Sequence, residues 1–302
     1  FEEAIQQYNK AIGIDAKYDE AYGNLGQALH EQKRLEEAIS AYQKAIDIGP
    51  ECTQYHRGYG DSLLLTGNWK QGWKEYEWRW KNDKFLARNE RIFPHLTWDG
   101  SSLDNTSILV WLEQGAGDQI MFASLLPKLQ QQAEQTFVEI EYRLYPIFRR
   151  SFHNIRFLIA RTQPHPQLLD ESIGYQSPIG SLAQWLLPNE ESFPKYHAYL
   201  KACQTKTKKF RKKYQQLANG KLLIGISWKS TKANNDFGKL KSTSLIQWTS
   251  LLNQKDCFFV NLQYGDVKSE LDEFSKKAGI LIYQDEEVDS LQSLDDFAAQ
   301  VA

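Results

Sequence analysis

The octapeptide Leu35-Glu-Glu-Ala-Ile-Ser-Ala-Tyr42 decides the fold of this chain, because two similar octapeptides flank it at a spacing of 34 residues. The earlier one is Phe1-Glu-Glu-Ala-Ile-Gln-Gln-Tyr8, and the later one is Trp69-Lys-Gln-Gly-Trp-Lys-Glu-Tyr76. A constant period of this length is typical of solenoids, in which each helical unit packs only on its neighbours. The sequence therefore predicts an α-α superhelix over residues 1–81.

The repeated positions have a packing role. A small residue lets two helices approach closely, and a Tyr four positions later fills the groove between them. These pairs are Ala4 and Tyr8, Ala38 and Tyr42, and Gly72 and Tyr76. The pattern resembles the tetratricopeptide-repeat (TPR) family, with the first repeat partial. The resemblance implies a protein or peptide partner at the groove of the array.

The third copy continues into an unusually aromatic segment, Glu75-Tyr-Glu-Trp-Arg-Trp-Lys81. Four aromatic side chains exceed what a two-helix repeat buries, so we predict that they cover an interface with the next domain. They are Trp73, Tyr76, Trp78 and Trp80. An exposed binding patch is the alternative. Residues 82–106 are rich in turn residues and are predicted to be a connector.

From residue 107 the hydrophobic pattern changes to alternating strands and helices. This alternation predicts a parallel, doubly wound sheet. We expect two such units, at residues 107–218 and 219–302. The predicted strands are 108–112, 137–142, 155–160, 222–228, 257–262 and 280–283.

A polar turn follows the first of these strands. Glu113 and Gln114 lie at its carboxyl end, where open α/β sheets bind ligands. Gly115-x-Gly117 would open a dinucleotide fingerprint, but the third glycine is absent, which argues against a dehydrogenase. Asp118 is simply explained as a helix cap. The turn can still aim the backbone amides of the next helix at an anion.

Three segments resemble a group of TPR proteins that carry a heptosyltransferase-like domain. They are Trp78-Arg-Trp80, Leu96-Thr-Trp98-Asp-Gly100 and Glu113-Gln-Gly-Ala-Gly-Asp-Gln-Ile-Met-Phe122. That domain is similar to glycosyltransferase family nine, whose GT-B architecture has two Rossmann-like halves. Ile224-Gly-Ile-Ser-Trp-Lys-Ser230 resembles the opening strand and loop of the second half, and Asn261-Leu-Gln-Tyr-Gly265 resembles its next strand and loop.

This resemblance implies a metal-independent inverting transfer of a sugar from a nucleotide-sugar to an acceptor, with no further cofactor. Asp118 is then the general base. Ser230 and Lys241 contact the donor phosphates, and Gln263 lies near the nucleotide. The other residues assigned to substrate or donor binding are Glu113, Gln114, Gly115 and Gly117. We take the acceptor side to be residues 107–218 and the donor side to be residues 219–302.

The family has a further strand and a donor-gripping loop after the helix that matches Leu294–Ala302. We therefore expect residues 1–302 to be a piece that lacks upstream repeats and this loop, and to be inactive alone. The intact protein is expected to be a glycosyltransferase. The alternative is a non-catalytic TPR scaffold with a degenerate transferase-like domain.

Charge and cysteine content narrow the function classes. A formal net charge of −2 argues against a nucleic-acid binder. The basic run at residues 206–213 is interpreted as the solvated face of a helix, with contact to an anionic surface as the alternative. Cys52, Cys203 and Cys257 show no metal-ligand spacing, which favours a reducing, cytoplasmic setting. No apolar run reaches the length of a membrane span.

Overall fold

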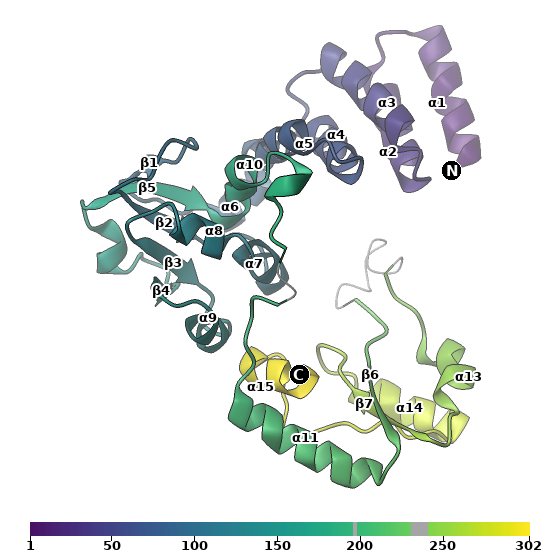
Figure 1. The fold of residues 1–302 in the computed structure, drawn as a ribbon. Helices are drawn as coiled ribbons and strands as arrows, with labels where there is room; N and C mark the ends of the chain where they lie inside the picture. The colour runs from purple at the N-terminus through teal and green to yellow at the C-terminus, as the bar shows by residue number, and fades with distance from the viewer. Residues whose placement is uncertain (196–197, 231–240) are drawn as a thin grey trace. The chain divides into compact units, whose positions relative to one another are not determined.

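The computed structural model describes residues 1–195, 198–230 and 241–302. The chain divides into two compact units (Figure 1). The first consists of Phe1–Glu141 and Phe152–Tyr199, and the second of Tyr142–Ser151 and Leu200–Ala302.

The first unit begins with the predicted helical repeats, which the structure confirms. Leu25, Leu29, Ala38 and Tyr42 form the centre of their core. These four residues occupy positions that align at a spacing of 34 residues. The residues that recur in the repeat are therefore the ones that pack its helices together. The helices are α1 Glu2–Ile14, α2 Asp19–Glu31, α3 Leu35–Ile48, α4 Thr53–Leu65 and α5 Trp69–Tyr76, and a 3-10 turn, η1 Glu77–Lys81, continues α5.

The Tyr42 ring sets a steric limit on the helices around it. A Cβ atom added to Gly58 would lie 2.3 Å from Tyr42 Cζ and 2.4 Å from its Oη. Because the Tyr42 side chain is buried, we expect Gly58→Ala to lower the free energy of unfolding by about 1–3 kcal/mol through overpacking. Urea denaturation followed by far-UV circular dichroism measures this change.

Gly13→Ala is the matched control, because Gly13 also lies in a helix and a Cβ there meets nothing within 4 Å. That variant should gain up to about 1 kcal/mol from the better helix propensity of Ala. Equal midpoints for the two variants would contradict the steric explanation.

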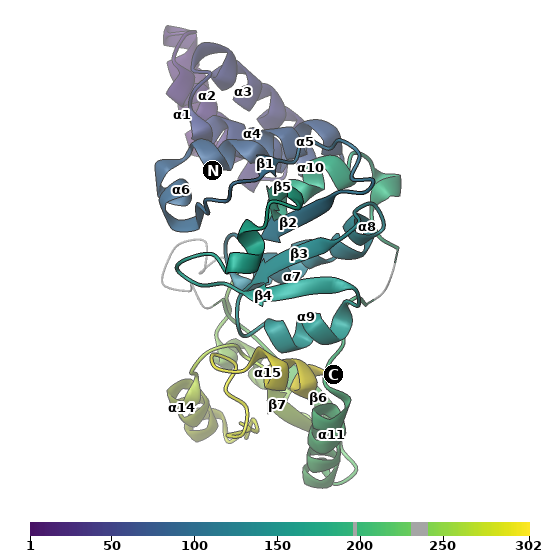
Figure 2. The same ribbon diagram turned by 90° about the vertical axis from the view of Figure 1, so that its left-hand side faces the viewer.

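The first unit continues as a parallel sheet with the order β1-β5-β2-β3-β4. Figure 2 shows β5, β2, β3 and β4 side by side. The strands are β1 Leu96–Thr97, β2 Ser107–Trp111, β3 Thr136–Ile140, β4 Ile155–Ile159 and β5 Ile173–Pro178. The accompanying helices are α6 Asp83–Asn89, α7 Ala116–Ala123, α8 Leu126–Gln130 and α10 Leu182–Leu186, with short 3-10 turns η2 Pro166–Leu169, η3 Ile179–Ser181 and η4 Glu190–Ser192.

Strands β2, β3 and β4 confirm the sequence prediction, whereas β1 and β5 were not predicted. Strand β5 contains Gly, Gln, Ser and Pro among its six residues, so it lacks the apolar run of a buried strand. It nevertheless lies between β1 and β2. Residues 82–106, predicted as a connector, contain α6 and β1. Two helices, α7 and α8, follow β2, and Pro127 stands in the first turn of α8.

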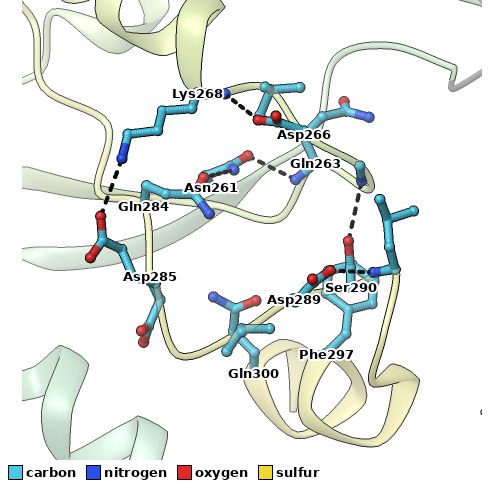
Figure 3. Close-up of a pocket in the computed structure, with 15 residues that line it drawn as sticks. Asn261, Gln263, Asp266, Lys268, Gln284, Asp285, Asp289, Ser290, Phe297 and Gln300 are labelled. Atoms are coloured by element: carbon cyan, nitrogen blue, oxygen red, sulfur yellow. Dashed lines mark hydrogen bonds and ion pairs between the residues drawn. The ribbon is translucent and has the colours of Figure 1, made fainter.

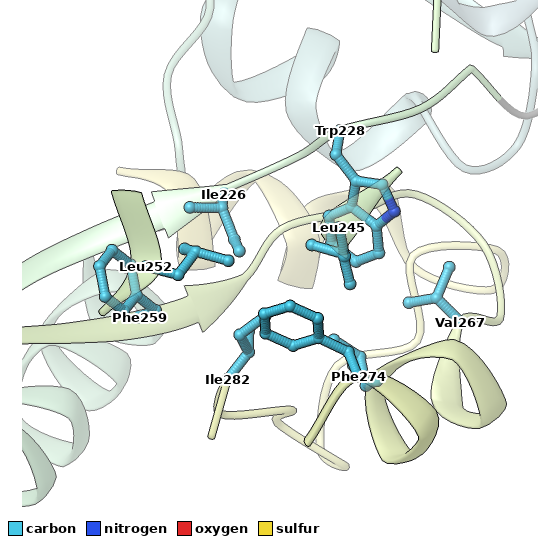
Figure 4. Packing of buried hydrophobic residues seen from close by; sticks show 9 residues of the cluster. Ile226, Trp228, Leu245, Leu252, Phe259, Val267, Phe274 and Ile282 are labelled. Atoms are coloured by element: carbon cyan, nitrogen blue, oxygen red, sulfur yellow. The ribbon is translucent and has the colours of Figure 1, made fainter. Parts of the chain in front are cut away.

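The second unit contains the parallel strands β6 Leu222–Ile226 and β7 Cys257–Asn261. A parallel bridge joins Val260 to Tyr283, in the segment where a further strand was predicted. Ile226, Trp228, Leu245, Phe259 and Phe274 meet in its core (Figure 4). The helices are α9 Tyr145–Ser151, α11 Gln204–Ala218, α13 Thr249–Leu252, α14 Lys268–Ala278 and α15 Leu294–Val301, with the 3-10 turn η5 Leu245–Trp248.

The basic run lies on α11, where several of its lysines pair with an acidic segment of the same unit. Lys206 contacts Asp295 at 2.8 Å, and Lys213 contacts Asp285 and Glu287, each at 2.8 Å. Lys206 and Lys213 are therefore half-buried in ion pairs, whereas Lys208, Lys209, Arg211 and Lys212 are exposed, so the solvated-face interpretation holds for most of the run. Helix α11 also packs on α15 and β6. The predicted boundary at residue 218 stays a prediction.

These ion pairs make the packing of α11 sensitive to acid. Hydrogen bonds from Lys209 and then Lys213 lower the pKa of the Glu287 carboxyl from about 4.5 to about 2. A carboxyl whose pKa is lower in the folded state stabilises that state above its unfolded pKa and loses the effect as the pH falls through the folded value. We expect the protection factors of the α11 amides, which are exchange rates corrected for the intrinsic effect of pH, to decrease as the pH falls from about 4.5 to about 2. Glu287→Gln should reduce this acid response, and an unchanged response would contradict the assignment.

Candidate functional site

Glu113 joins the repeats to the sheet. It follows β2, and its side chain is completely buried. Arg79, in the turn η1 that ends the repeats, donates from Nε to Oε2 at 2.9 Å and from Nη2 to Oε1 at 2.8 Å. The backbone N–H of Gly180 also donates to Oε1 at 2.8 Å. The ligand contact predicted for Glu113 would therefore have to compete with three protein donors.

Aromatic side chains pack around this ion pair. Trp73 and Tyr76 lie 6.4 and 6.2 Å from the Phe122 ring of α7, and Trp80 lies 5.4 Å from the Trp111 ring of β2. The predicted interface is confirmed for these three residues.

For Trp78 the predicted interface is not confirmed, because its recorded ring contacts among the described residues lie within the repeats. Its ring stacks on His56 of α4 with centroids 3.4 Å apart. Lys81 Nζ lies 3.6 Å from the centroid of the Trp78 ring. Trp78 lies in the 3-10 turn η1, after the end of α5.

The turn after β2 is also held by residues of the preceding helices. Gln114 has a positive φ of 60°, a conformation that non-glycine residues adopt at a cost. Its N–H donates to Asn89 Oδ1 at 2.9 Å, and its Nε2 donates to Tyr76 Oη at 2.7 Å. Burial raises the pKa of Tyr76 to about 12, so the phenol is neutral at physiological pH. The conformation of Gln114 therefore depends on the end of the repeats.

Asp118 caps α7. Its Oδ2 accepts a hydrogen bond from the N–H of Gly115 at 3.3 Å. The side chain is half-buried, and Gly115 and Gly117 beside it are exposed. A Cβ added to Gly117 would meet nothing within 4 Å. The turn thus presents backbone and a carboxylate at the carboxyl end of β2, while a base role for Asp118 stays a prediction.

In the second unit, Gln263 connects the loops that follow β6 and β7. Its Oε1 accepts hydrogen bonds from the N–H groups of Trp228 and Lys229, both at 2.9 Å, and its Nε2 donates to the carbonyl of Lys229 at 2.8 Å. The N–H of Ser230 donates to Ser242 Oγ at 3.0 Å. The structure therefore brings Gln263 and the loop of Ser230 together.

Lys241 is exposed and borders residues 231–240, which lie outside the described residues. Its predicted contact with a donor phosphate stays a prediction.

The amide of Gln263 should contribute strongly to the stability of the second unit. We expect Gln263→Leu to lower the free energy of unfolding by about 1–3 kcal/mol, because it leaves the N–H groups of Trp228 and Lys229 without their acceptor. Chemical denaturation followed by near-UV circular dichroism measures the change. Gln254→Leu is the control, because Gln254 is exposed and makes one long hydrogen bond of 3.4 Å. Equal losses of unfolding free energy in the two variants would contradict the proposal that Gln263 holds the two loops together.

A pocket of about 300 Å³ opens at the carboxyl end of β7 (Figure 3). Asn261 and Gln263 lie on one side of it, and Phe297 and Gln300 of α15 lie on another. Sequence reasoning identified Gln263 and missed the rest. The available signal was an acidic turn directly after the apolar segment at 280–283. The charged residues that line the pocket are Asp266, Lys268, Asp285, Glu286 and Asp289.

The comparisons with known proteins agree on the repeats. Residues 19–52 match a family model described as tetratricopeptide repeat, and residues 1–33 match one described as TPR repeat. A segment of 59 residues is 37% identical to the small glutamine-rich tetratricopeptide repeat-containing protein 2 of Mycosarcoma maydis, covering 20% of this chain and 17% of that protein.

One relative is matched along nearly the whole chain. Protein FlbA of Caulobacter vibrioides is 28% identical over 317 residues, which cover 99% of this chain and 52% of that protein. The chain thus spans about half the length of this relative.

Two solved structures are similar at low scores. MamA matches 29% of this chain and 48% of its own, with 24% identity and a TM-score of 0.25. A mutant O-GlcNAc transferase of Thermobaculum terrenum matches 95% of this chain and 71% of its own, with 11% identity and a TM-score of 0.28. In the described ranges, no helix is both long and apolar enough to cross a membrane.

Proposed function

We propose that the intact protein is a glycosyltransferase that moves a sugar from a nucleotide-sugar to an acceptor, and that its TPR repeats dock the acceptor or a partner protein. The observation that carries this proposal is the turn at Gln114–Asp118. It presents a carboxylate at the carboxyl end of β2. Gln114 of the turn donates to Tyr76, and the adjacent Glu113 is bound by Arg79. Because the repeats contact this turn, they are suited to deliver an acceptor to it.

In this proposal Asp118 accepts the proton of the acceptor hydroxyl as that oxygen attacks the anomeric carbon of the donor sugar. The bond from that carbon to the diphosphate breaks, and its electron pair leaves with the nucleoside diphosphate. Ser230 and Lys241 are proposed to stabilise the developing negative charge. The proposed domains are repeats at 1–81, a connector at 82–106, an acceptor half at 107–218 and a donor half at 219–302.

We assign the nucleoside of the donor to the pocket beside Gln263. Its lining contains four carboxylates, Asp266, Asp285, Glu286 and Asp289. Asp285 is paired with Lys213 and Glu286 with Lys268, so Asp266 and Asp289 are the two that have no recorded cationic partner among the described residues. Such a lining repels a diphosphate but accepts hydrogen bonds from ribose hydroxyls and base N–H groups. Ser230 and Lys241 lie outside this lining, so the phosphate contacts proposed for them are separate from the nucleoside pocket.

Calorimetry on the intact protein tests the proposal. We expect one nucleoside diphosphate to bind in a comparison of the uridine, guanosine, adenosine and cytidine compounds, and its parent nucleoside to bind more weakly. If none of the four, and no corresponding nucleotide-sugar, binds the intact protein, the transferase proposal is wrong.

A non-catalytic scaffold is the second candidate. It is favoured by the engagement of Glu113 and Gln114 in contacts with the repeats rather than in an open site. The three free cysteines, Cys52, Cys203 and Cys257, support the proposed cytoplasmic setting for either function. A partner captured through residues 1–81, with no nucleotide binding, would favour the scaffold.

A further inference from the structure

A separate cavity of about 320 Å³ lies in the first unit, at the carboxyl ends of β1, β2 and β5. The chain runs from β2 outward through β3 and β4, and then returns to the other side of β2 as β5. Open parallel sheets bind ligands at such a reversal. We call this cavity the tryptophan pocket, because Trp80, Trp98, Trp111 and Trp185 line it.

Indole rings supply much of its wall. The N–H of Trp98 donates to the carbonyl of Ser101 at 2.9 Å, and the N–H of Trp111 donates to Gln176 Oε1. These two rings therefore have only apolar surface left to offer a ligand. Trp185 is 38% exposed, and its ring lies 6.5 Å from that of Trp98.

Polar groups at the pocket remain available. Among residues 1–195, 198–230 and 241–302, the side chains of Gln184 and Glu90 have no recorded hydrogen-bond partner. Both line the pocket. The Thr97 hydroxyl, also in the lining, accepts one hydrogen bond at 3.1 Å from Gln176. An amide, a carboxylate and a hydroxyl can together donate to and accept from a ligand that carries several hydroxyls.

The charges disfavour an anionic ligand. Arg91 lines the pocket but donates from Nε to the buried carboxylate of Glu139 at 2.9 Å. The Glu77 carboxylate accepts from Arg79 at 2.6 Å and from the Ser181 hydroxyl at 2.8 Å, so both of its oxygens are already engaged. Within the described ranges, the exposed Glu90 is then the lining carboxylate that has no recorded cationic partner. A single carboxylate at the rim, beside uncharged polar groups, suits a neutral ligand better than a cation. Aromatic cages that bind cations place carboxylates close to the bound charge.

We propose that the tryptophan pocket binds a neutral sugar ring. The C–H face of a pyranose packs against an indole, and its hydroxyls hydrogen-bond with Gln184, Thr97 and Glu90. The cavity is of a size that small-molecule sites have. This binding goes beyond the proposed transfer, because it uses neither Asp118 nor the pocket at Gln263. A protein that recognises a sugar here would select acceptors that already carry one.

The test is ligand-detected NMR on the 302-residue chain, with methyl glycosides of glucose, galactose, mannose and N-acetylglucosamine as probes. Choline serves as the cation probe and inorganic phosphate as the anion probe. We expect saturation transfer to the ring protons of at least one glycoside, and none to choline. Phosphate, followed by ³¹P line width, should not bind.

Variants connect the signal to the pocket. Trp185→Ala should weaken glycoside binding about tenfold through the lost ring contact, and Gln184→Ala should weaken it measurably. Trp248→Ala, an indole of the second unit outside this lining, should leave binding unchanged.

Three results would each overturn the proposal. In the first, choline binds and no glycoside does; in the second, no probe binds; in the third, the Trp185→Ala variant binds the glycoside as tightly as the unchanged chain does. Nucleotide binding is a separate measurement, so its absence would sink the proposed transfer and leave this inference standing.

Discussion

Arg79→Ala is expected to lower the free energy of unfolding of the first unit by about 3–5 kcal/mol. The side chain of Glu113 is fully buried, and that of Arg79 is 8% exposed. Removing the guanidinium leaves a buried carboxylate with the N–H of Gly180 as its remaining donor. An uncompensated buried charge is among the most destabilising changes a single substitution can make. Guanidinium chloride denaturation followed by tryptophan fluorescence measures the loss.

Two controls separate the effect of burying the Arg79–Glu113 ion pair from the effect of losing an ion pair as such. Lys81→Ala removes an exposed ion pair with Glu51, whose atoms lie 3.3 Å apart, and a contact with the Trp78 ring, and should cost at most about 2 kcal/mol. The double variant Arg79→Met, Glu113→Leu removes both buried charges and should recover most of the stability lost in Arg79→Ala. If Arg79→Ala is as mild as Lys81→Ala, this ion pair does not hold the repeats to the sheet.

Asp118→Asn is expected to lower the kcat of the intact transferase by about 10²–10⁴-fold, because an amide cannot take the acceptor proton. The fold should persist, since the Asn oxygen can still accept the hydrogen bond that Gly115 donates. Release of nucleoside diphosphate from the donor that calorimetry identifies measures kcat. Far-UV circular dichroism confirms that the variant is folded.

Asp83→Asn is the matched control, because Asp83 is an exposed aspartate in the first turn of another helix, α6. It should retain full turnover. Full turnover in Asp118→Asn would assign the base to another group. An intact protein that binds partners but shows no turnover in any form would favour the scaffold.

Much of the fold follows from local patterns in the chain. The repeats were predicted because each period carries the residues that pack its own helices, such as Ala38 and Tyr42. Strands β2 and β7 were predicted from unbroken apolar runs. The cap at Asp118 was predicted because its partner, Gly115, is three residues away.

Other features depend on partners that lie far along the chain. Glu113 was interpreted as a ligand contact, but its partners are Arg79, 34 residues earlier, and Gly180, 67 residues later. Lys213 was interpreted as part of a solvated face, but Asp285 is 72 residues away. The local sequence around a charged residue does not indicate whether its side chain faces solvent, a ligand or a buried partner.

The sequence by itself thus determined the repeats, the apolar strands and the helix cap, because adjacent residues supply each of their interactions. Only the tertiary structure decided that β5 is a central strand and that Arg79 is bound to Glu113. It also brought Trp80, Trp98, Trp111 and Trp185 to one pocket. The physical reason is that strand order, ion-pair partners and cavity walls are set by which distant segments pack together, and no local pattern specifies that choice.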